Sequence, residues 1–214
     1  LLFQASSLLW HPPKARVWLT VFYAGPDHDP ATQNVINHIR KRRGEVNGHQ
    51  TFEFFPIILP REKLFRRAIG RHMRSQECTS DVLYYCDADM SFGEGCIDYL
   101  CEHVKDDGKL YGPARTLINN DWQTGDAMIQ AAGDWPRIDP TKFKWQTNRV
   151  LIGGIQVLGR ETAKRLGYLG DQPKWQKPGH PDKPFPCFRD DSVWRRKHFP
   201  MGEGKQVKLA VPNI

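Results

Sequence analysis

Two aspartates separated by one residue, Asp87 and Asp89, directly follow a strand-forming run, DVLYYC at 81–86. Carboxylates spaced this way on a turn can face one pocket and share a hard divalent cation, because carboxylate oxygens suit Mg²⁺ and Mn²⁺. Such a cation can bridge the oxygens of a nucleotide diphosphate. The alternative is that both aspartates only cap a turn. The strand before the pair favours the first interpretation, a site for a metal and a diphosphate.

The elements that must position this pair are read from hydrophobic spacing. Runs rich in β-branched and aromatic residues predict strands at 16–23, 51–59 and 81–86. Apolar residues at helical spacing predict helices at 29–43, 62–76 and 96–104. Pro56 favours an edge position for the second strand. This alternation predicts an α/β sandwich with a central, mainly parallel sheet, whose ligands bind at the carboxyl ends of the strands.

The second half of the chain is less regular. Its predicted elements are a strand at 110–118, a strand at 150–158 broken by two glycines, and a short helix at 161–166. Two further segments are polar or proline-rich, an expected loop-rich insertion at 119–139 and a candidate lid at 170–186. Residues 1–15, of which 1–10 are mostly apolar, are expected to be either an appended remnant or an arm packed on the domain.

Composition narrows the class of protein. The 214 residues fit one domain, and no apolar run approaches the roughly 18 residues that cross a bilayer. Five cysteines form no C-x-x-C pair, so free thiols and a cytoplasmic location are expected. The net charge of +7 invites nucleic-acid binding. Because the basic residues are dispersed and no nucleic-acid-binding motif accompanies them, no nucleic-acid partner is expected.

The order of the motifs resembles that of the GT-A-fold glycosyltransferases, most closely glycosyltransferase family 2. In chain order the motifs are FRRAIGR at 65–71, VLYYCDADM at 82–90, GGIQ at 153–156 and RDDSVWRR at 189–196. The resemblance covers about 16–199. Arg189 stands where the family usually has Glu, and the first strand ends FYAG at 22–25 in place of the usual Pro-x-Tyr-Asn. The stretches TVFYA and DADMSF are also similar to the retaining family that contains the blood-group transferases.

The resemblance implies a GT-A, Rossmann-like α/β/α sandwich and a metal-dependent glycosyltransferase. Such an enzyme moves a sugar from a UDP- or GDP-sugar to a hydroxyl of a glycan or another acceptor. Inversion is the first expectation and retention the alternative. One catalytic domain would span 16–214, with a nucleotide-binding half at about 16–108 and an acceptor-binding half at about 109–200.

The resemblance also implies roles for particular residues. Asp89 would bind Mn²⁺ or Mg²⁺, Asp87 would contact the ribose or a metal-bound water, and His198 is the candidate third metal ligand. Asp190 would be the base, with Asp191 as a rival, because neighbouring carboxylates disfavour each other's ionisation. The remaining donor-binding candidates are Tyr23, Asp27, Arg66, Arg71, Ala88, Gly153, Gly154 and Gln156. Trp194 would stack on the acceptor sugar, or else be buried in its helix.

These residues also have structural interpretations. They are a strand end and turn for Tyr23 and Asp27, a solvated face for the arginines and a β-bulge for the glycines. For Asp190 and Asp191 the alternative is a helix N-terminus, and for His198 a satisfied or exposed histidine. Two other classes stay open. A nucleotidyltransferase would need a glycine-rich, lysine-bearing loop after the first strand, whereas GPDH at 25–28 has one glycine and no lysine. A basic nucleic-acid-binding module would bind more weakly as salt rises and would ignore Mn²⁺.

Overall fold

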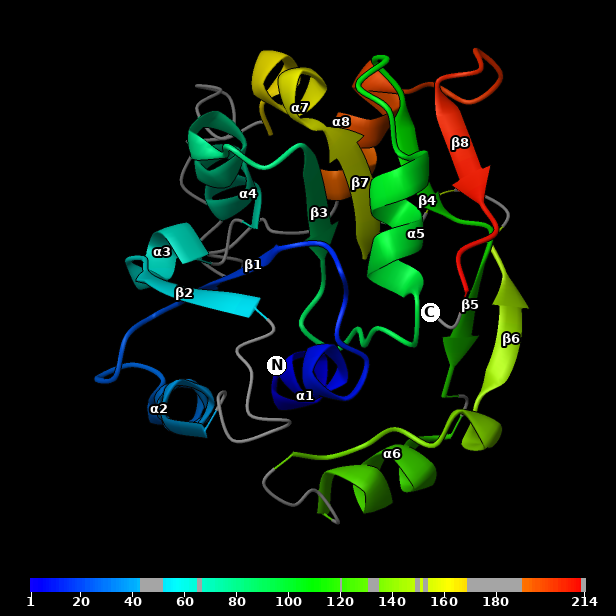
Figure 1. Ribbon diagram of the computed structural model, residues 1–214. Coiled ribbons are helices and arrows are strands. Elements are labelled where there is room, and N and C mark those ends of the chain that lie inside the picture. The colour runs from blue at the N-terminus through cyan, green and yellow to red at the C-terminus, as the bar shows by residue number, and fades with distance from the viewer. Residues whose placement is uncertain are drawn as a thin grey trace, which may run out of the picture.

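A computed structural model describes residues 1–42, 52–64, 67–119, 121–130, 135–148, 151, 154–168 and 190–212 (Figure 1). The side chains at 62, 67, 122, 124, 128, 129 and 190–193 lie outside that description. The helices are α1 (Leu2–Trp10), α2 (Pro30–Arg42), α3 (Arg61–Leu64), α4 (Arg67–Glu77), α5 (Cys96–His103), α6 (Trp122–Gln130), the 3₁₀ turn η1 (Pro140–Lys142), α7 (Arg160–Leu166) and α8 (Asp190–His198). The strands are β1 (Val17–Tyr23), β2 (Phe52–Ile58), β3 (Val82–Cys86), β4 (Leu110–Pro113), β5 (Arg115–Ile118), β6 (Lys144–Thr147), β7 (Ile155–Gly159) and β8 (Gln206–Leu209). The chain is therefore mixed α/β, as predicted.

The strands belong to three small sheets. β1 and β2 are parallel, β5 and β6 are an antiparallel ribbon, and the third sheet has the order β3-β7-β4-β8. In that third sheet β7 is antiparallel to both β3 and β4, while β4 and β8 are parallel. The described strands do not form the single, mainly parallel sheet that was predicted. The chain enters β7 from Gly154, whose carbonyl accepts the amide of Asp87 at the end of β3, so β7 runs back along β3.

The first half of the chain follows its sequence pattern closely. Strands form within 16–23, 51–59 and 81–86, and α2 begins at Pro30 after the side chain of Asp29 accepts the Thr32 amide at 3.0 Å. Among the described residues β2 pairs with β1 alone, so Pro56 does lie on an edge strand. The expected helix at 62–76 is two helices, α3 and α4, and residues 65 and 66 between them are outside the description.

The second half departs further from expectation. The strand predicted at 110–118 divides at Ala114 into β4 and β5, which join different sheets. The insertion at 119–139, expected to be loop-rich, contains α6, while β6 and β8 were not predicted. All four residues of β6 are exposed, so the strand lacks the apolar alternation by which a half-buried strand is recognised. The candidate lid at 170–186 lies outside the described residues.

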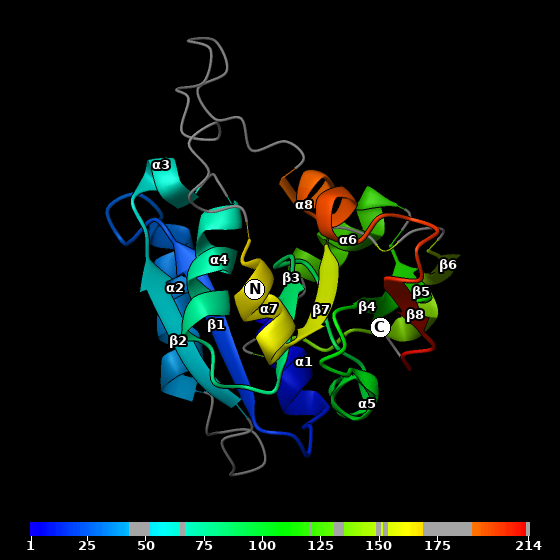
Figure 2. The same cartoon turned by 90° about the horizontal axis from the view of Figure 1, so that it is seen from above.

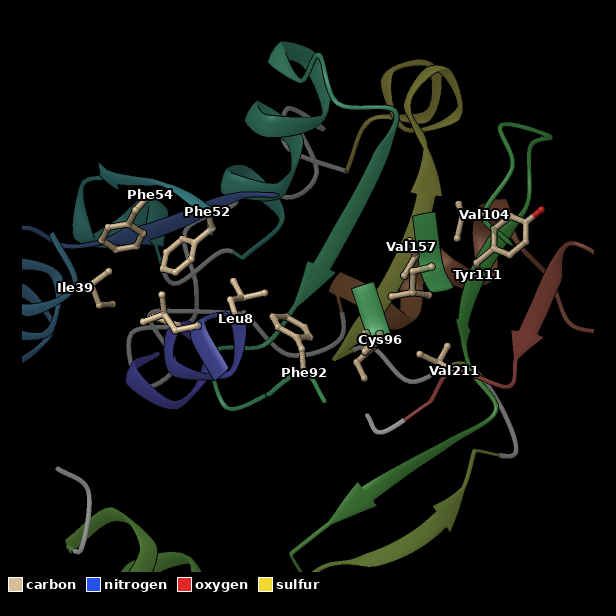
Figure 3. Packing of buried hydrophobic residues seen from close by; sticks show 14 of the residues in the cluster. Leu8, Ile39, Phe52, Phe54, Phe92, Cys96, Val104, Tyr111, Val157 and Val211 are labelled. Atoms are coloured by element: carbon tan, nitrogen blue, oxygen red, sulfur yellow. The ribbon is translucent and has the colours of Figure 1, made fainter. Parts of the chain in front are cut away.

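Residues 1–15, expected as a remnant or a packed arm, contain a buried helix that joins the two halves of the core. Figure 1 shows α1 beneath both the β1–β2 pair and the four-stranded sheet. Leu8 and Leu9 of α1 are fully buried in one cluster that extends from Phe52 on β2 to Val157 on β7. In Figure 3, Leu8 lies between Phe52 and Phe92. The helix thus contributes apolar side chains to a cluster that includes residues of both sheets.

Helices α4 and α7 lie side by side, on the opposite side of β1 and β3 from α1 (Figures 1 and 2). Glycines permit two close approaches there. A Cβ at Gly70 of α4 would lie 2.7 Å from the Phe22 ring of β1, and one at Gly167, after α7, would lie 2.7 Å from Nδ1 of His72. The φ of +57° at Gly167 also disfavours any other residue at this turn. These contacts hold α4 against both β1 and the segment that follows α7.

Candidate functional site

The aspartate pair lies on a tight turn at the carboxyl end of β3. The Asp87 amide donates to the Gly154 carbonyl at 3.0 Å, which extends the β3–β7 ladder by one residue. The Met90 amide then donates to the Asp87 carbonyl at 3.2 Å and closes the turn. Ala88 and Asp89 are exposed at its tip. The backbone of Asp87 is therefore held by the sheet, while the Asp89 carboxylate faces solvent.

The side chain of Asp87 lies between an arginine and a glycine. Nη2 of Arg71, on α4, donates to Oδ1 of Asp87 at 3.2 Å. The other oxygen, Oδ2, would lie 3.1 Å from a Cβ at position 154. That separation is tighter than an ordinary contact, so glycine at 154 leaves the room that this carboxylate occupies. The sequence-predicted residues Arg71, Asp87 and Gly154 are thus brought together.

Arg71 is only 8% exposed and is held by a polar network behind the turn. Its Nη1 donates to the Tyr168 hydroxyl at 2.8 Å, and that hydroxyl donates to Oε1 of Gln156 at 2.7 Å. The guanidinium also lies over two rings, 5.3 Å from that of Tyr168 and 5.9 Å from that of Tyr85. A buried cation requires hydrogen bonds and a counter-charge, and Asp87 supplies the counter-charge.

Helix α1 supports the same turn from below. The backbone nitrogen of Leu1 donates to the Ala88 carbonyl at 2.8 Å, and Nε2 of Gln4 donates to the Asp87 carbonyl at 3.3 Å. Oγ of Ser7 accepts the Phe92 amide at 3.0 Å. Sequence reasoning missed these residues. The available signal was that Gln4 and Ser7 are polar positions in an otherwise apolar helical stretch.

A cavity of about 400 Å³ separates β1 from β3, with the turn at its rim. The lining includes residues 16–22 of β1 and its approach, residues 82–86 of β3, and Arg71, Asp87 and Ala88. Among the described residues β1 pairs only with β2, and β3 pairs only with β7, so the facing edges of both strands border this space. Asp87 and the buried guanidinium of Arg71 thus lie on the wall of this cavity, and exposed Asp89 follows on the same turn outside the lining.

Two predicted residues, Tyr23 and Trp194, are placed differently from their expected roles. Tyr23 is 5% exposed, and its hydroxyl donates to Oε1 of Gln33 at 2.7 Å, so the ring offers no free face for a base. Trp194 is fully buried, donates to the Gly167 carbonyl at 2.8 Å and stacks on Tyr168. It is a core residue in this structure and not a platform for an acceptor. Asp27 is exposed in the turn after β1.

The predicted third metal ligand is not assembled with the aspartates. Burial lowers the pKa of His198, with Lys197 and Arg165 contributing further, and its ring lies 5.9 Å from that of Trp194. Within the described ranges no three His, Cys, Asp or Glu side chains gather closely enough to hold a metal ion. His198 therefore belongs to the packing around α8. The Asp87 carboxylate points to Arg71 and Gly154, whereas Asp89 is exposed on the same turn.

Several predicted residues cannot be placed in this geometry. Arg66 and Gly153 lie outside the described residues. Asp190 and Asp191 are the first two residues of α8, but their side chains are outside the description. Gln156 is fully buried, and its Nε2 has no hydrogen-bond partner among the described residues. Its Oε1 accepts from Tyr168 of the Asp87 network, so Gln156 is a buried member of that network in this structure.

The donor set fits a hard divalent cation in an open site. Magnesium is commonly held by one or two carboxylates, with waters and substrate phosphates completing its shell, so a third protein ligand is not required. Asp89 is exposed, and Asp87 forms an ion pair with Arg71.

No described helix combines the length and the apolar character needed to span a membrane. No protein-family model, curated protein or solved structure matches this chain.

Proposed function

We propose that this chain is a metal-dependent glycosyltransferase of the GT-A type that transfers a sugar from a UDP- or GDP-sugar to a hydroxyl acceptor, with inversion. The observation that carries the proposal is the Asp87–Asp89 turn at the carboxyl end of β3, on the rim of a 400 Å³ cavity and in contact with Arg71. Ligands of open α/β sheets bind at this end of the strands. The motif order described above supports a nucleotide-sugar as that ligand.

Asp89, with Asp87 beside it, would hold Mn²⁺ or Mg²⁺. When bound, this cation would offset the negative charge that builds on the departing diphosphate. Arg71 adds a forked, permanently charged donor at the same place, which suits phosphate oxygens. The exposed carboxylate of Asp89 would meet the metal cation, and the guanidinium of Arg71 would meet the phosphate anion of the same ligand.

Two other groups serve the sugar and the reaction. Gly154 keeps side-chain atoms away from Asp87. Gln156 is assigned to the donor sugar on motif resemblance alone, and its side chain is fully buried. Inversion needs a base that takes the proton from the acceptor hydroxyl as it attacks the anomeric carbon. Asp190, with Asp191 as the rival, is assigned this role on motif resemblance. Asp190 lies at the start of α8, one helical turn before Trp194, which packs on Tyr168 of the Asp87 network.

A thermal-shift panel of nucleotide diphosphates and their sugars, each with and without Mn²⁺, tests the proposal. We expect one sugar-nucleotide to raise Tm only when Mn²⁺ is present. Asp89→Ala should abolish that shift. The exposed Asp126 on α6 offers the matched control, since Asp126→Ala removes the same carboxylate elsewhere and should leave the shift intact.

Turnover is tested separately with the sugar-nucleotide that the panel identifies. Asp190→Asn should keep the thermal shift and lose transfer or donor hydrolysis, while Asp191→Asn discriminates the rival base. The proton NMR spectrum of the product reports whether the anomeric configuration inverts. A shift that ignores Mn²⁺, or binding to nucleic acid that weakens steeply with salt, would contradict the proposal.

A further inference from the structure

The Tyr168 hydroxyl links two polar side chains that come from different elements. It donates to Oε1 of Gln156 on β7 at 2.7 Å and accepts from Nη1 of Arg71 on α4 at 2.8 Å. Nη2 of the same guanidinium reaches Oδ1 of Asp87 at 3.2 Å. The direction of this chain follows from its chemistry. A guanidinium only donates and a carboxylate only accepts, so the hydroxyl proton of Tyr168 is directed to Gln156.

Tyr168 itself is held independently of its hydroxyl. Its ring stacks on Trp194 with centroids 4.4 Å apart and meets the Tyr85 ring edge-on at 5.2 Å. Its backbone amide donates to Nδ1 of His72 at 3.0 Å. The hydroxyl is therefore presented to Arg71 from a rigid, fully buried ring. Removing the hydroxyl alone should leave the ring in place.

Arg71 stays beside Asp87 because its buried hydrogen bonds are made there. A buried guanidinium that loses an acceptor is less favourable than one that keeps it. We propose that Tyr168 is a positioning residue whose hydroxyl, oriented by Gln156, holds Arg71 against Asp87 and so sets the charge at the cation site. The link to a cation rests on the proposed function, whereas the link from Tyr168 to Arg71 does not.

The positive charge on Arg71 determines the direction in which Mn²⁺ affinity should change when Arg71 or Tyr168 is replaced. A guanidinium next to Asp87 repels a divalent ion bound there. Repulsion between a unit charge and a divalent ion about 5 Å apart, at the dielectric constant of water, corresponds to roughly a tenfold change in affinity. Arg71→Met should therefore raise Mn²⁺ affinity about tenfold or more. Tyr168→Phe should raise it part of the way, because Arg71 then leaves Asp87 more often.

The test is a double-mutant cycle on Mn²⁺ affinity, measured by electron paramagnetic resonance for the wild type, Tyr168→Phe, Arg71→Met and the double variant. We expect Tyr168→Phe to raise affinity in the wild type and to change nothing in the Arg71→Met background. If Arg71→Met does not fold, Arg71→Gln replaces it, since glutamine removes the charge and keeps a polar side chain at the same place. Tyr84→Phe is the matched control, because the buried Tyr84 hydroxyl has no hydrogen-bond partner among the described residues.

An unchanged or lowered affinity in Tyr168→Phe would overturn the inference, as would an equal effect in both backgrounds. If the wild type binds no Mn²⁺, the proposed function fails, and a cycle on urea unfolding decides the remaining link. Coupling between Tyr168→Phe and Arg71→Met in that cycle supports the positioning contact, and strict additivity overturns it.

Discussion

Replacing Ser7 by alanine tests whether α1 holds in place the loop that carries Asp87 and Asp89. Ser7 is buried, and its Oγ accepts the Phe92 amide at 3.0 Å while donating to the Gln4 carbonyl at 2.7 Å. The first bond joins α1 to the end of the loop that carries Asp87 and Asp89. The second lies inside the helix, where the Gln4 carbonyl also has a place in the helical hydrogen-bond ladder.

The expected cost follows from which group loses its partner. In Ser7→Ala the buried Phe92 amide is left without this acceptor, and an unsatisfied buried donor costs about 1–3 kcal/mol. Loss of the bond within α1 should add little, because alanine is a better helix former than serine. We therefore expect unfolding to become easier by about 1–3 kcal/mol. Each 1.4 kcal/mol by which the loop's attachment to α1 is weakened corresponds to a tenfold rise in the fraction of molecules whose loop is detached.

The neighbouring serine is a matched control in the same helix. Ser6 is also buried, and its Oγ donates to the Leu2 carbonyl at 2.8 Å, a bond within α1. Ser6→Ala should therefore cost far less than Ser7→Ala in urea unfolding. Hydrogen exchange of the Phe92 amide, followed by NMR, should accelerate in Ser7→Ala alone. Equal unfolding costs for the two variants, or unchanged exchange at Phe92, would refute the reasoning.

Three further outcomes follow from individual contacts. Gly154→Ala places a Cβ 3.1 Å from Oδ2 of Asp87, so we expect weaker Mn²⁺ binding in calorimetry and little loss of stability. Unaltered Mn²⁺ binding in this variant would contradict the expectation. Burial raises the pKa of the Cys96 thiol to about 12, so stability in urea should fall as pH rises above the pKa of an unfolded cysteine, about 8.5. Exposed Cys101 should react with a maleimide before buried Cys96 does under native conditions. Partial burial raises the pKa of Asp106, but hydrogen bonds from the Thr162 side chain and from the amides of Glu161 and Thr162 outweigh it and lower the pKa. The stability that Asp106 contributes should therefore be present above its ordinary pKa and be lost as pH falls through the lowered value, and urea unfolding of Asp106→Asn should lack that component.

Local pattern was sufficient for the elements near the aspartate pair. The strand at 81–86 and the turn after it depend on neighbours in sequence, since β-branched and aromatic residues favour a strand and aspartates favour its end. The edge position of β2 could also be predicted locally, from Pro56, because proline lacks the backbone donor that a central strand needs. The position of Asp87 and Asp89 at a strand end was thus predictable from the sequence.

Contacts between segments far apart in the sequence could not be predicted from local sequence pattern. Gln4 meets the Asp87 carbonyl across 83 positions, and Arg71 meets Tyr168 across 97. No spacing rule connects such residues, because only the packing of α1, α4 and β7 around β3 brings them together. The β5–β6 ribbon escaped notice because β6 is exposed throughout and lacks a recognisable period.

The sequence by itself determined the residue types of the candidate site and the element that carries its acidic pair. The tertiary structure decided which side chains reach that pair, placing Trp194 and Tyr23 in the core, leaving His198 apart, and bringing in α1 and Tyr168. The physical reason is one of range. Backbone propensity acts over a few neighbouring residues, whereas burial and buried hydrogen bonding depend on the whole arrangement of the chain.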